Sequence, residues 1–556
     1  MPREPEELFE LFDRLLDNPD DDKLVEEADQ AIADDPRSSL IAIRRHIPDE
    51  PQQILVDTAS IPKATLAKTK PPEKRQVWWD PIRRRSMDPL LYCKPKSLKE
   101  LTEYVQAATA QGLRVKAVGS GHSFSDVTDA PDYLIAMHGL NKKLPIAAST
   151  LKDPAAASSL VRVEGGLRIC DLNRLLDDGK QAMQNLGGYT GQTIAGAIAT
   201  GTHGSGITLG PLADFVESLQ IVSTNGVVYQ VERTNGITDK AKFPNEEDGV
   251  PVNLIQDDDT FYAVVVSMGC MGIVYSLCLR VLDRYWLRET RLIEPWAKIK
   301  VDIKDAAEVG RTRHYEVMLN PHQYKGNRAC LVTRREMKTT PSSSGDPLGK
   351  IRNPLAELLQ RLQGDGQVLI TIMNIVPKLV PLFLNRAIGA LADPEYWALW
   401  HKVFDLGPIN DVRAYGIEVA VPFDQAGAAA ETVFDIAAKT ASLGNQYTTA
   451  PFAIRFVQES KALLAPMYKR PTCMIEMICM YGTRGHEELL RRYEAALVSR
   501  HKGRPHWGLS LGVPRGRAEV EALYPGSFAT WHMKYRAFNA NGTFNNAFTD
   551  RIGVSV

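Results

Sequence analysis

Glycine and small hydroxyl residues are concentrated in residues 185–206, NLGGYTGQTIAGAIATGTHGSG, which contain seven glycines. Each glycine costs more backbone entropy on folding than alanine does, so such density needs a reason. Backbone that wraps closely around a large flat ligand with phosphate groups supplies one, because amides and hydroxyls then donate to phosphate oxygens. A glycine-rich surface loop is the alternative, but the apolar residues within 194–199 favour burial. The segment therefore predicts a binding site for a phosphorylated ligand.

A second glycine-rich segment covers residues 115–126, VKAVGSGHSFSD. An apolar strand runs here into the turn Gly119-Ser120-Gly121, where missing Cβ atoms let backbone amides approach an anion. His122 follows within the turn and would face whatever the amides hold. Taken alone, the pattern is also typical of a plain turn. It is not a dinucleotide fingerprint, because GxGxxG leading into a helix is absent.

The composition excludes several classes of protein. Of the 556 residues, 44% are hydrophobic and 24% charged, which excludes a disordered chain. The 66 basic and 67 acidic residues give a formal charge of −1, so no global field attracts nucleic acid. Seven cysteines without CxxC spacing disfavour a disulfide framework and a zinc site, and the histidines form no HExxH motif. We therefore expect no metal.

The terminus and the apolar segments predict a cytoplasmic protein without a membrane span. Residues 1–22 are acidic and lack the basic and apolar regions of a signal peptide. The most apolar segment, 368–392, is interrupted by Pro, Lys, Asn and Arg. It falls short of the roughly 18 uninterrupted apolar residues that a spanning helix needs. The cysteine usage favours a reducing compartment.

Short strands alternate with helices from residue 78 to about residue 282, which predicts a mixed α+β domain. The helix at 97–112 has Ser97 as its cap, with Glu100 at capping-box spacing. Asn225-Gly226 is typical of the turn in a β-hairpin. The predicted strands are 113–118, 133–137, 160–164, 218–223, 227–232 and 271–281, and a second helix spans 169–178.

The regions on either side of this domain have their own patterns. Residues 283–500 combine strands at 328–334, 415–421, 453–457 and 473–481 with helices at 424–442 and 486–500. Before residue 78, helical patterns at 6–17, 23–33 and 40–46 precede a linker rich in Pro and Lys at 62–74. We expect this piece to dock on the protein's own body, and a partner-binding helix is the alternative.

Three segments together resemble the vanillyl-alcohol-oxidase, or PCMH-type, class of FAD proteins: AVGSGHSFSD, NLGGYTGQTIAGAIATGTHGSG and VVSMGCMGIVYSLCLRV at 265–281. Within that class the chain is similar to the aldonolactone and alditol oxidase group, through 454–470, RPHWG at 504–508 and NANGTFNNAF at 539–548. The resemblance is strong over 78–282 and looser over 283–556. It implies an α+β fold with two lobes: an FAD domain at 78–282, a cap domain for substrate at 283–525, and a tail at 526–556 that returns to the FAD domain. The first 75 residues, within the helical extension and linker at 1–77, lie outside the resemblance.

The resemblance also implies how the cofactor is held. His122 occupies the position of a histidine joined covalently to the 8α carbon of the isoalloxazine ring. Gly187 follows the Asn-Leu pair near the flavin's reactive edge, where glycine leaves access for oxygen and favours an oxidase; one more turn glycine is the alternative. The residues expected to cradle FAD are Val118, Gly119, Ser120, Gly121, His122, Ser123, Gly187, Gly188, Thr193, Gly196, Ala199, Thr200, Gly201, Thr202, His203, Gly204, Gly206, Gly269, Gly272, Ile273 and Val274.

Substrate oxidation in this group depends on a Glu-x-Arg strand and a His-Trp-Gly-Lys segment, and the chain departs from both. The strand is Ala453-Ile454-Arg455 and the segment is His506-Trp507-Gly508-Leu509, so a carboxylate and a lysine are missing. Glu476 would supply the carboxylate if its strand lies beside that of Arg455; a structural ion pair is the alternative. Glu418 stands where relatives often have glutamate. The candidate catalytic residues are therefore Arg455, Glu476, His506 and Glu418.

These features predict an FAD-dependent oxidase acting on a CH–OH group of a sugar-derived lactone, an alditol or a related alcohol. Gly188 replaces a substrate-binding serine of some sugar-alcohol oxidases, so we expect a less polar pocket. Hydride would pass to flavin N5, and oxygen would reoxidise the flavin and give hydrogen peroxide. The expected partners are a small-molecule substrate and oxygen, with the oligomeric state left open. The alternatives are a dehydrogenase of the same fold with another electron acceptor and a flavin-bearing protein without turnover.

Overall fold

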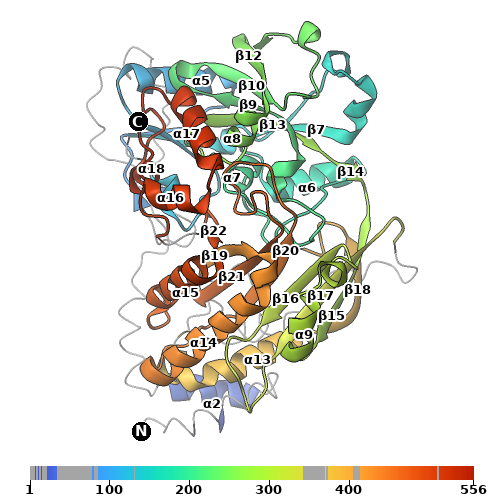
Figure 1. Ribbon diagram of the computed structural model, residues 1–556, viewed down its shortest axis with the longest axis vertical. Coiled ribbons are helices and arrows are strands. Elements are labelled where there is room, and N and C mark those ends of the chain that lie inside the picture. The colour runs from blue at the N-terminus through green and yellow to red at the C-terminus, as the bar shows by residue number, and fades with distance from the viewer. Residues whose placement is uncertain are drawn as a thin grey trace. The chain divides into compact units, whose positions relative to one another are not determined.

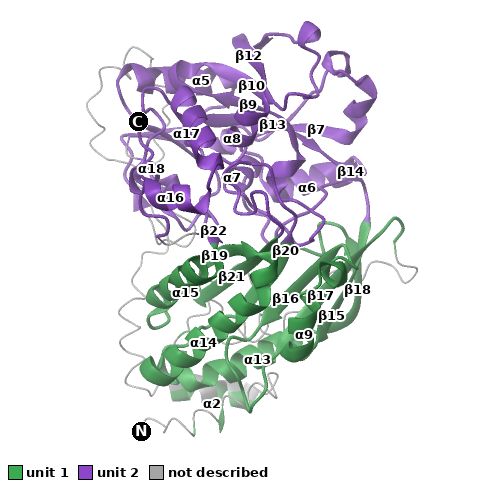
Figure 2. Ribbon diagram, viewed as in Figure 1, with its two compact units in different colours: residues 1–52, 286–456, 472–503 green, residues 53–285, 457–471, 504–556 purple. Residues whose placement is uncertain are grey.

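The computed structural model describes two compact units (Figure 2). Unit 1 draws its described residues from 1–52, 286–456 and 472–503, and unit 2 from 53–285, 457–471 and 504–556. The predicted cap domain, 283–525, therefore contains three stretches, 283–285, 457–471 and 504–525, that group with unit 2. The residues described are 7, 10, 11, 14, 22–33, 78–79, 86–130, 132–341, 370, 373–404, 414–509 and 512–556.

Unit 2 is built on a mixed sheet of seven strands in the order β11-β12-β10-β9-β13-β7-β6 (Figure 1). Asn225 and Gly226 have φ values of 59° and 71° between β9 and β10, which pair antiparallel. The predicted hairpin is thus confirmed, because this left-handed pair of residues suits a tight turn between twisted strands. The strands are β6 Lys143–Leu144, β7 Leu160–Glu164, β9 Val216–Val222, β10 Val228–Glu232, β11 Glu246–Glu247, β12 Val250–Gln256 and β13 Ile273–Arg280.

A parallel sheet of three strands lies beside helix α5, Leu98–Ala110, in the same unit. Its strands are β3 Leu91–Cys93, β4 Val115–Val118 and β5 Tyr133–Ala136, in the order β3-β5-β4. Apolar side chains of α5, β4 and β5 share one core cluster with residues of the large sheet, so the two sheets and α5 form one packed body. Ser97 caps α5 by accepting the amide of Glu100, as predicted, but the Glu100 carboxylate accepts from the amide of Lys96.

The carboxyl-terminal residues complete unit 2. The amide of Val115 on β4 donates to the carbonyl of Thr543 at 2.6 Å, and the side chain of Asn546 donates to the carbonyls of Val127 and Asp129. The remaining elements of the unit are strands β1 Trp78–Trp79, β2 Ser86–Met87, β8 Gln181–Ala182, β14 Leu282–Asp283 and β22 Arg504–Pro505, and helices α6 Ile169–Asp178, α7 Ile194–Ala199, α8 Asp258–Val264, α16 Arg517–Leu523, α17 Ser527–Phe538 and α18 Ala547–Arg551.

Unit 1 carries seven strands in the order β18-β15-β17-β16-β20-β21-β19. Phe434 of helix α14 packs on Phe452 of β20 and on Trp296 of helix α9, so these helices cover the sheet face that carries Phe452. Side chains alternate along a strand, so Arg455 of β20 lies on the opposite face. The strands are β15 Trp286–Ile293, β16 His314–Leu319, β17 Cys330–Lys338, β18 Asp393–Leu399, β19 Ala414–Pro422, β20 Phe452–Val457 and β21 Thr472–Met480.

The helices of unit 1 match the prediction where they can be compared. The predicted helices at 424–442 and 486–500 correspond to α14 and α15, and the predicted helix at 23–33 to α2. Four residues of the predicted 6–17 helix are described, and all are helical. The predicted pattern at 40–46 and the linker at 62–74 lie outside the described residues. The helices are α2 Asp22–Ala33, α9 Trp296–Asp302, α10 Ala306–Val309, α13 Val380–Ala390, α14 Ala426–Gly444 and α15 His486–His501.

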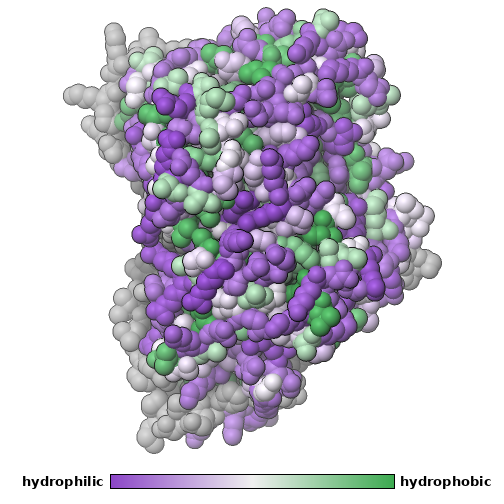
Figure 3. Space-filling model, in the orientation of Figure 1, coloured by the Kyte–Doolittle hydropathy of each residue, from purple (hydrophilic) through white to green (hydrophobic). Residues whose placement is uncertain are grey.

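The surface is largely polar. On the face drawn in Figure 3, hydrophilic side chains predominate and apolar residues are scattered among them in small groups. Within the described part of the chain, no helix has both the length and the apolar character required to cross a membrane. All seven cysteines are free.

Candidate active site

The three segments that the sequence singled out as a cofactor cradle meet in unit 2. The buried side chain of Lys116, on β4, donates to the carbonyl of Met268 at 2.7 Å, and the amide of Met268 donates to the carbonyl of Ala199 at 3.0 Å. A Cβ atom built on Gly119 would lie 2.0 Å from the hydroxyl oxygen of Thr193. Residues far apart in the sequence therefore form one continuous site.

Glycine is required in this site for two physical reasons. Gly121 and Gly201 have φ values of 72° and 83°, which side chains rarely adopt. A Cβ atom on Gly204 would lie 2.2 Å from the Asn185 side chain, so the backbone there packs without room for one. Other residues of the site, such as Ser120, stay partly exposed, so a ligand can reach them.

His122 follows the Gly119–Gly121 turn, and its Nε2 lies 2.6 Å from the hydroxyl oxygen of Tyr189. The two rings pack with their centroids 4.3 Å apart. Burial lowers the pKa of His122 to about 4, so the imidazole is neutral at neutral pH. A neutral imidazole keeps a lone pair on one ring nitrogen and can act as a nucleophile where that lone pair is free. These residues fit a phosphorylated aromatic cofactor: small residues and amides where phosphates would lie, and a nucleophile beside them.

Lys116 is a member of the site that the sequence did not reveal. It is fully buried, and this burial lowers its pKa to about 8. Its ammonium group supports the turn at Met268 and Gly269, both of which have positive φ. The available signal was a single charged residue within the apolar strand 115–118.

Two further histidines of unit 2 have defined proton positions. His203 places Nδ1 at 2.8 Å from the carbonyl oxygen of Gly204, so that nitrogen carries the proton. His506 accepts the amide of Gly508 at Nδ1, so its proton is on Nε2. Their ring centroids are 6.1 Å apart. His506 thus lies beside the predicted cradle.

The other candidate catalytic residues lie in unit 1, on the face of the sheet opposite to α14. Arg455 of β20 donates to Glu476 of the neighbouring strand β21 at 2.6 Å, which confirms the predicted pairing of these two side chains. Its Nε donates to Glu316 of β16 at 2.9 Å. Glu418 of β19 lies opposite Glu476 and 3.7 Å from Arg455. One guanidinium therefore stands among three carboxylates.

These side chains extend into a longer row that we call the charge ladder. Arg335 of β17 donates to Glu289 of β15 at 2.6 Å and to Glu316 at 3.2 Å. Six consecutive strands thus contribute one charged side chain each, in the order Glu289, Arg335, Glu316, Arg455, Glu476 and Glu418. Arg455 and Arg335 hold the pKa of the partly buried Glu316 at about 2, against the effect of desolvation. The surrounding carboxylates raise the pKa of Arg455.

The sequence predicted only the last three members of the charge ladder. Glu289, Arg335 and Glu316 were missed because their partners come from strands far away in the sequence. A single charged residue among buried neighbours, as Glu316 is within HYEVML, was the available signal. Ala453 lies on the same strand face as Arg455, where the family pattern has a carboxylate.

Asp214 anchors the loop that follows the glycine-rich segment. It accepts the hydroxyl of Ser460 at 2.6 Å, and burial raises its pKa from 3.8 to about 6. Because the folded-state pKa is the higher one, ionised Asp214 costs stability above pH 6, and this cost vanishes as the pH falls below about 4.

The variant D214N should therefore be more stable than the wild type at pH 7.5, by about 1–3 kcal/mol. The amide oxygen keeps the hydrogen bond from Ser460 without the buried charge. Thermal unfolding at pH 7.5 and pH 4 measures the effect, and the gain should shrink at the lower pH. A lower melting temperature of D214N at pH 7.5 would show that the carboxylate stabilises the fold.

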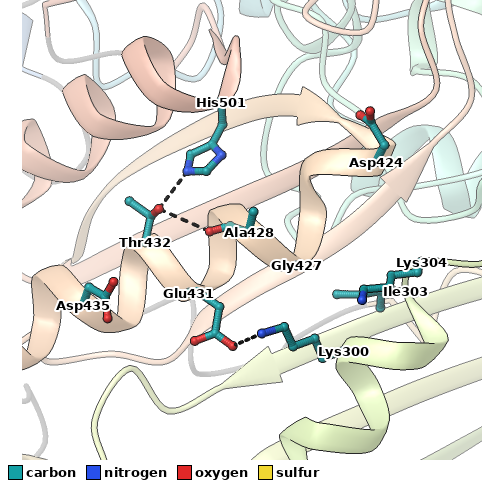
Figure 4. A pocket seen from close by; sticks show the side chains of 10 residues that line it. All are labelled: Lys300, Ile303, Lys304, Asp424, Gly427, Ala428, Glu431, Thr432, Asp435 and His501. Atoms are coloured by element: carbon teal, nitrogen blue, oxygen red, sulfur yellow. Dashed lines mark hydrogen bonds and ion pairs between the residues drawn. The ribbon is translucent and has the colours of Figure 1, made fainter.

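A separate hollow of about 560 Å³ opens on unit 1 between α9, α14 and the end of α15 (Figure 4). Lys300 donates to Glu431 across it at 2.8 Å, and His501 lies 2.7 Å from the Thr432 hydroxyl. None of the predicted site residues lines it. Within the described ranges, no three His, Cys, Asp or Glu side chains are grouped to hold a metal ion. The lining residues are Lys300, Ile303, Lys304, Asp424, Gly427, Ala428, Glu431, Thr432, Asp435 and His501.

Two family models match the chain in succession. One described as an FAD binding domain matches residues 89–232, which lie within unit 2. The other, described as D-arabinono-1,4-lactone oxidase, matches residues 278–552. The cradle formed by the first two glycine-rich segments falls in the first match, and the whole charge ladder falls in the second.

Similar sequences carry related names. L-gulonolactone oxidase of Bos taurus is 24% identical over 84% of this chain and 95% of its own length. L-gulono-1,4-lactone dehydrogenase of Mycobacterium tuberculosis is 26% identical over 76% of this chain and 86% of its own. D-arabinono-1,4-lactone oxidase of Kluyveromyces lactis is 32% identical, over 37% of this chain and 34% of its own.

Solved structures share the fold. Cholesterol oxidase from B. sterolicum superposes with a TM-score of 0.65 at 15% identity, covering 87% of this chain and 99% of that one. BBE-like 1 of Physcomitrella patens gives a TM-score of 0.54 at 14% identity, covering 84% and 92%. The predicted α+β architecture with two parts is thus confirmed, and the FAD binding domain model assigns FAD binding to the first of them.

Proposed function

This chain belongs to the PCMH-type FAD proteins, in the aldonolactone oxidase group, and we propose from this that it oxidises a CH–OH group of a sugar-derived lactone or a related alcohol. In this proposal unit 2 holds FAD. Oxygen would be the final electron acceptor and hydrogen peroxide the second product.

One observation carries the proposal: the two glycine-rich segments contact each other and the turn at Met268 and Gly269, and both segments lie in the part that matches an FAD binding domain. When bound, FAD supplies the acceptor for the two electrons of the CH–OH carbon. The chain's own part is to hold the cofactor with amides and hydroxyls, and to keep His122 neutral for covalent attachment at the flavin 8α carbon.

The charge ladder supports separate roles for Arg455 and Glu476 at the substrate hydroxyl. Arg455 offers a fixed positive charge that can hold the hydroxyl oxygen, and Glu476 can take its proton in the same position. The pairing at 2.6 Å orients both groups. Glu476 thereby takes the place of the family's glutamate, where this chain has Ala453. Leu509 and Gly188 replace polar residues, so the proposed substrate is less polar than an alditol.

The decisive experiment joins two measurements on the purified protein. Acid denaturation should precipitate the yellow colour with the protein if FAD is covalently bound. Aldonolactones, alditols and bulkier alcohols are then added anaerobically, and a substrate should bleach the flavin. Peroxide on readmitting air identifies an oxidase, whereas reduction of an artificial dye alone identifies a dehydrogenase. A coloured protein that no such compound bleaches would contradict turnover.

Gly187 separates the oxidase from the dehydrogenase, an alternative favoured by the mycobacterial relative's name. A Cβ atom at this position would lie 3.2 Å from the His203 carbonyl oxygen, so alanine fits after a small shift. The variant G187A should slow flavin reoxidation by oxygen by about tenfold or more, roughly 1.4 kcal/mol, and leave anaerobic reduction unchanged. Stopped-flow absorbance measures both rates. Equal reoxidation rates would assign Gly187 to the turn alone.

A further inference from the structure

Tyr189 is the closest hydrogen-bonding partner that the structure gives to the His122 ring. Its hydroxyl oxygen lies 2.6 Å from Nε2, and the rings are inclined by 58° with their centroids 4.3 Å apart. Tyr189 comes from the glycine-rich segment 185–206, whereas His122 follows β4. This contact fixes which of the two ring nitrogens remains available.

A neutral imidazole carries one proton, so the contact has two forms. If the tyrosine hydroxyl donates to Nε2, the proton is on Nδ1 and neither nitrogen offers a lone pair to a ligand. If Nε2 donates to the hydroxyl oxygen, the lone pair of Nδ1 is free. Only the second form makes His122 a nucleophile.

We propose that Tyr189 is the positioning residue for covalent attachment of the cofactor, because it accepts the Nε2 proton of His122 and leaves Nδ1 to form the bond. This inference rests on the proposed function, which assigns FAD to this site. Burial keeps the imidazole neutral, so both forms of the hydrogen bond are accessible at neutral pH.

Covalent attachment is a two-electron oxidation of the 8α methyl group. A bond forms between Nδ1 and the 8α carbon, one C–H bond of the 8α methyl group breaks, and the Nε2 proton leaves. The two electrons and two protons pass to dioxygen, which becomes hydrogen peroxide. Once attached, the imidazole has no N–H, and its Nε2 can only accept a hydrogen bond. A hydroxyl suits both states, since it accepts before the reaction and donates afterwards.

Gly191 supports this placement of Tyr189. A Cβ atom on Gly191 would lie 2.3 Å from the Tyr189 hydroxyl oxygen and 2.7 Å from the ring carbon that bears it. The absence of a side chain at this position therefore allows the hydroxyl to lie where it meets His122. Alanine at position 191 would displace the phenol while leaving it in the chain.

The test compares covalent attachment in the wild type, Y189F and G191A. Each protein is produced under riboflavin depletion, purified and mixed with FAD in air. At intervals the denatured protein is separated on a gel and its flavin fluorescence is read. We expect both variants to attach FAD at least about tenfold more slowly than the wild type, with non-covalent FAD binding unchanged. Y229F, which alters a tyrosine of β10 that packs on Phe538, is the matched control and should behave as wild type.

A second readout locates the bond. After proteolysis of the wild type, NMR of the flavin peptide should show attachment through Nδ1. Attachment through Nε2, or a Y189F rate equal to that of the wild type, would overturn the role of Tyr189. A wild type that releases all its FAD in acid would instead contradict the covalent bond of the proposed function, and the Tyr189 proposal with it.

Discussion

Replacing Arg455 by lysine should lower the rate of anaerobic flavin reduction by a lactone about a hundredfold, equivalent to about 2.7 kcal/mol. Lysine keeps the positive charge but has no planar fork with several donors. Its single nitrogen cannot occupy the positions of both Nε and Nη1, from which Arg455 donates to Glu316 at 2.9 Å and to Glu476 at 2.6 Å. The substrate hydroxyl would then meet a misplaced cation and an unoriented carboxylate. Stopped-flow bleaching measures the rate.

The charge ladder provides a control for this prediction. Arg335 also bonds two carboxylates, Glu289 and Glu316, but it lies farther along the sheet from Glu476. R335K should therefore destabilise unit 1 to a similar extent and leave most of the reduction rate. If R335K and R455K lose the same activity, Arg455 is part of a structural network only.

Glu476 is tested by the same measurement. E476Q keeps the shape and a hydrogen-bond acceptor for Arg455 but cannot take a proton, so reduction should slow in parallel with R455K. The flavin content of the variant serves as the check on folding. Unchanged turnover of E476Q with full flavin content would remove Glu476 from the chemistry.

The second large effect is expected at the cofactor. G119A places a Cβ atom 2.0 Å from the Thr193 hydroxyl oxygen and 2.8 Å from its methyl carbon, where Thr193 is buried. The two glycine-rich segments must separate to admit it. Overpacking of this kind costs about 1–3 kcal/mol, which would weaken FAD binding by about 5- to 150-fold.

Flavin absorbance per protein after purification reports this loss, and a titration of the flavin-depleted protein with FAD gives the affinity. G179A is the matched control, because its Cβ atom in the same unit meets nothing closer than 3.4 Å. Full flavin content in purified G119A would show that the two glycine-rich segments admit the added methyl group without separating.

Local sequence patterns predicted several features of unit 2 correctly. The Ser97 cap, the Asn225-Gly226 turn and the density of glycine each depend on residues close together in the sequence, and the structure places them as expected. The FAD assignment rested on the same segments. Such features can be predicted because backbone conformation and capping are local properties.

Unit 1 was harder to predict because its charged residues are paired across strands. Glu289 and Arg335 are 46 residues apart, and Glu316 and Arg455 are 139 apart. Nothing local distinguishes a buried Arg335 within CLVTRREMK from the charged neighbours beside it. The division into units was equally non-local: residues 457–471 leave their neighbouring strands for unit 2, guided by contacts such as that of Ser460 with Asp214.

The hydrogen bond from Val115 to Thr543 has a consequence for biosynthesis. The strand that leads into the Gly119 turn is held by a residue synthesised more than four hundred positions later. Because a ribosome delivers the chain from its amino end, this strand lacks its partner until more than four hundred further residues have been synthesised. Cofactor capture should therefore follow the synthesis of Thr543, and the riboflavin available at that moment would decide how much of the protein acquires its flavin.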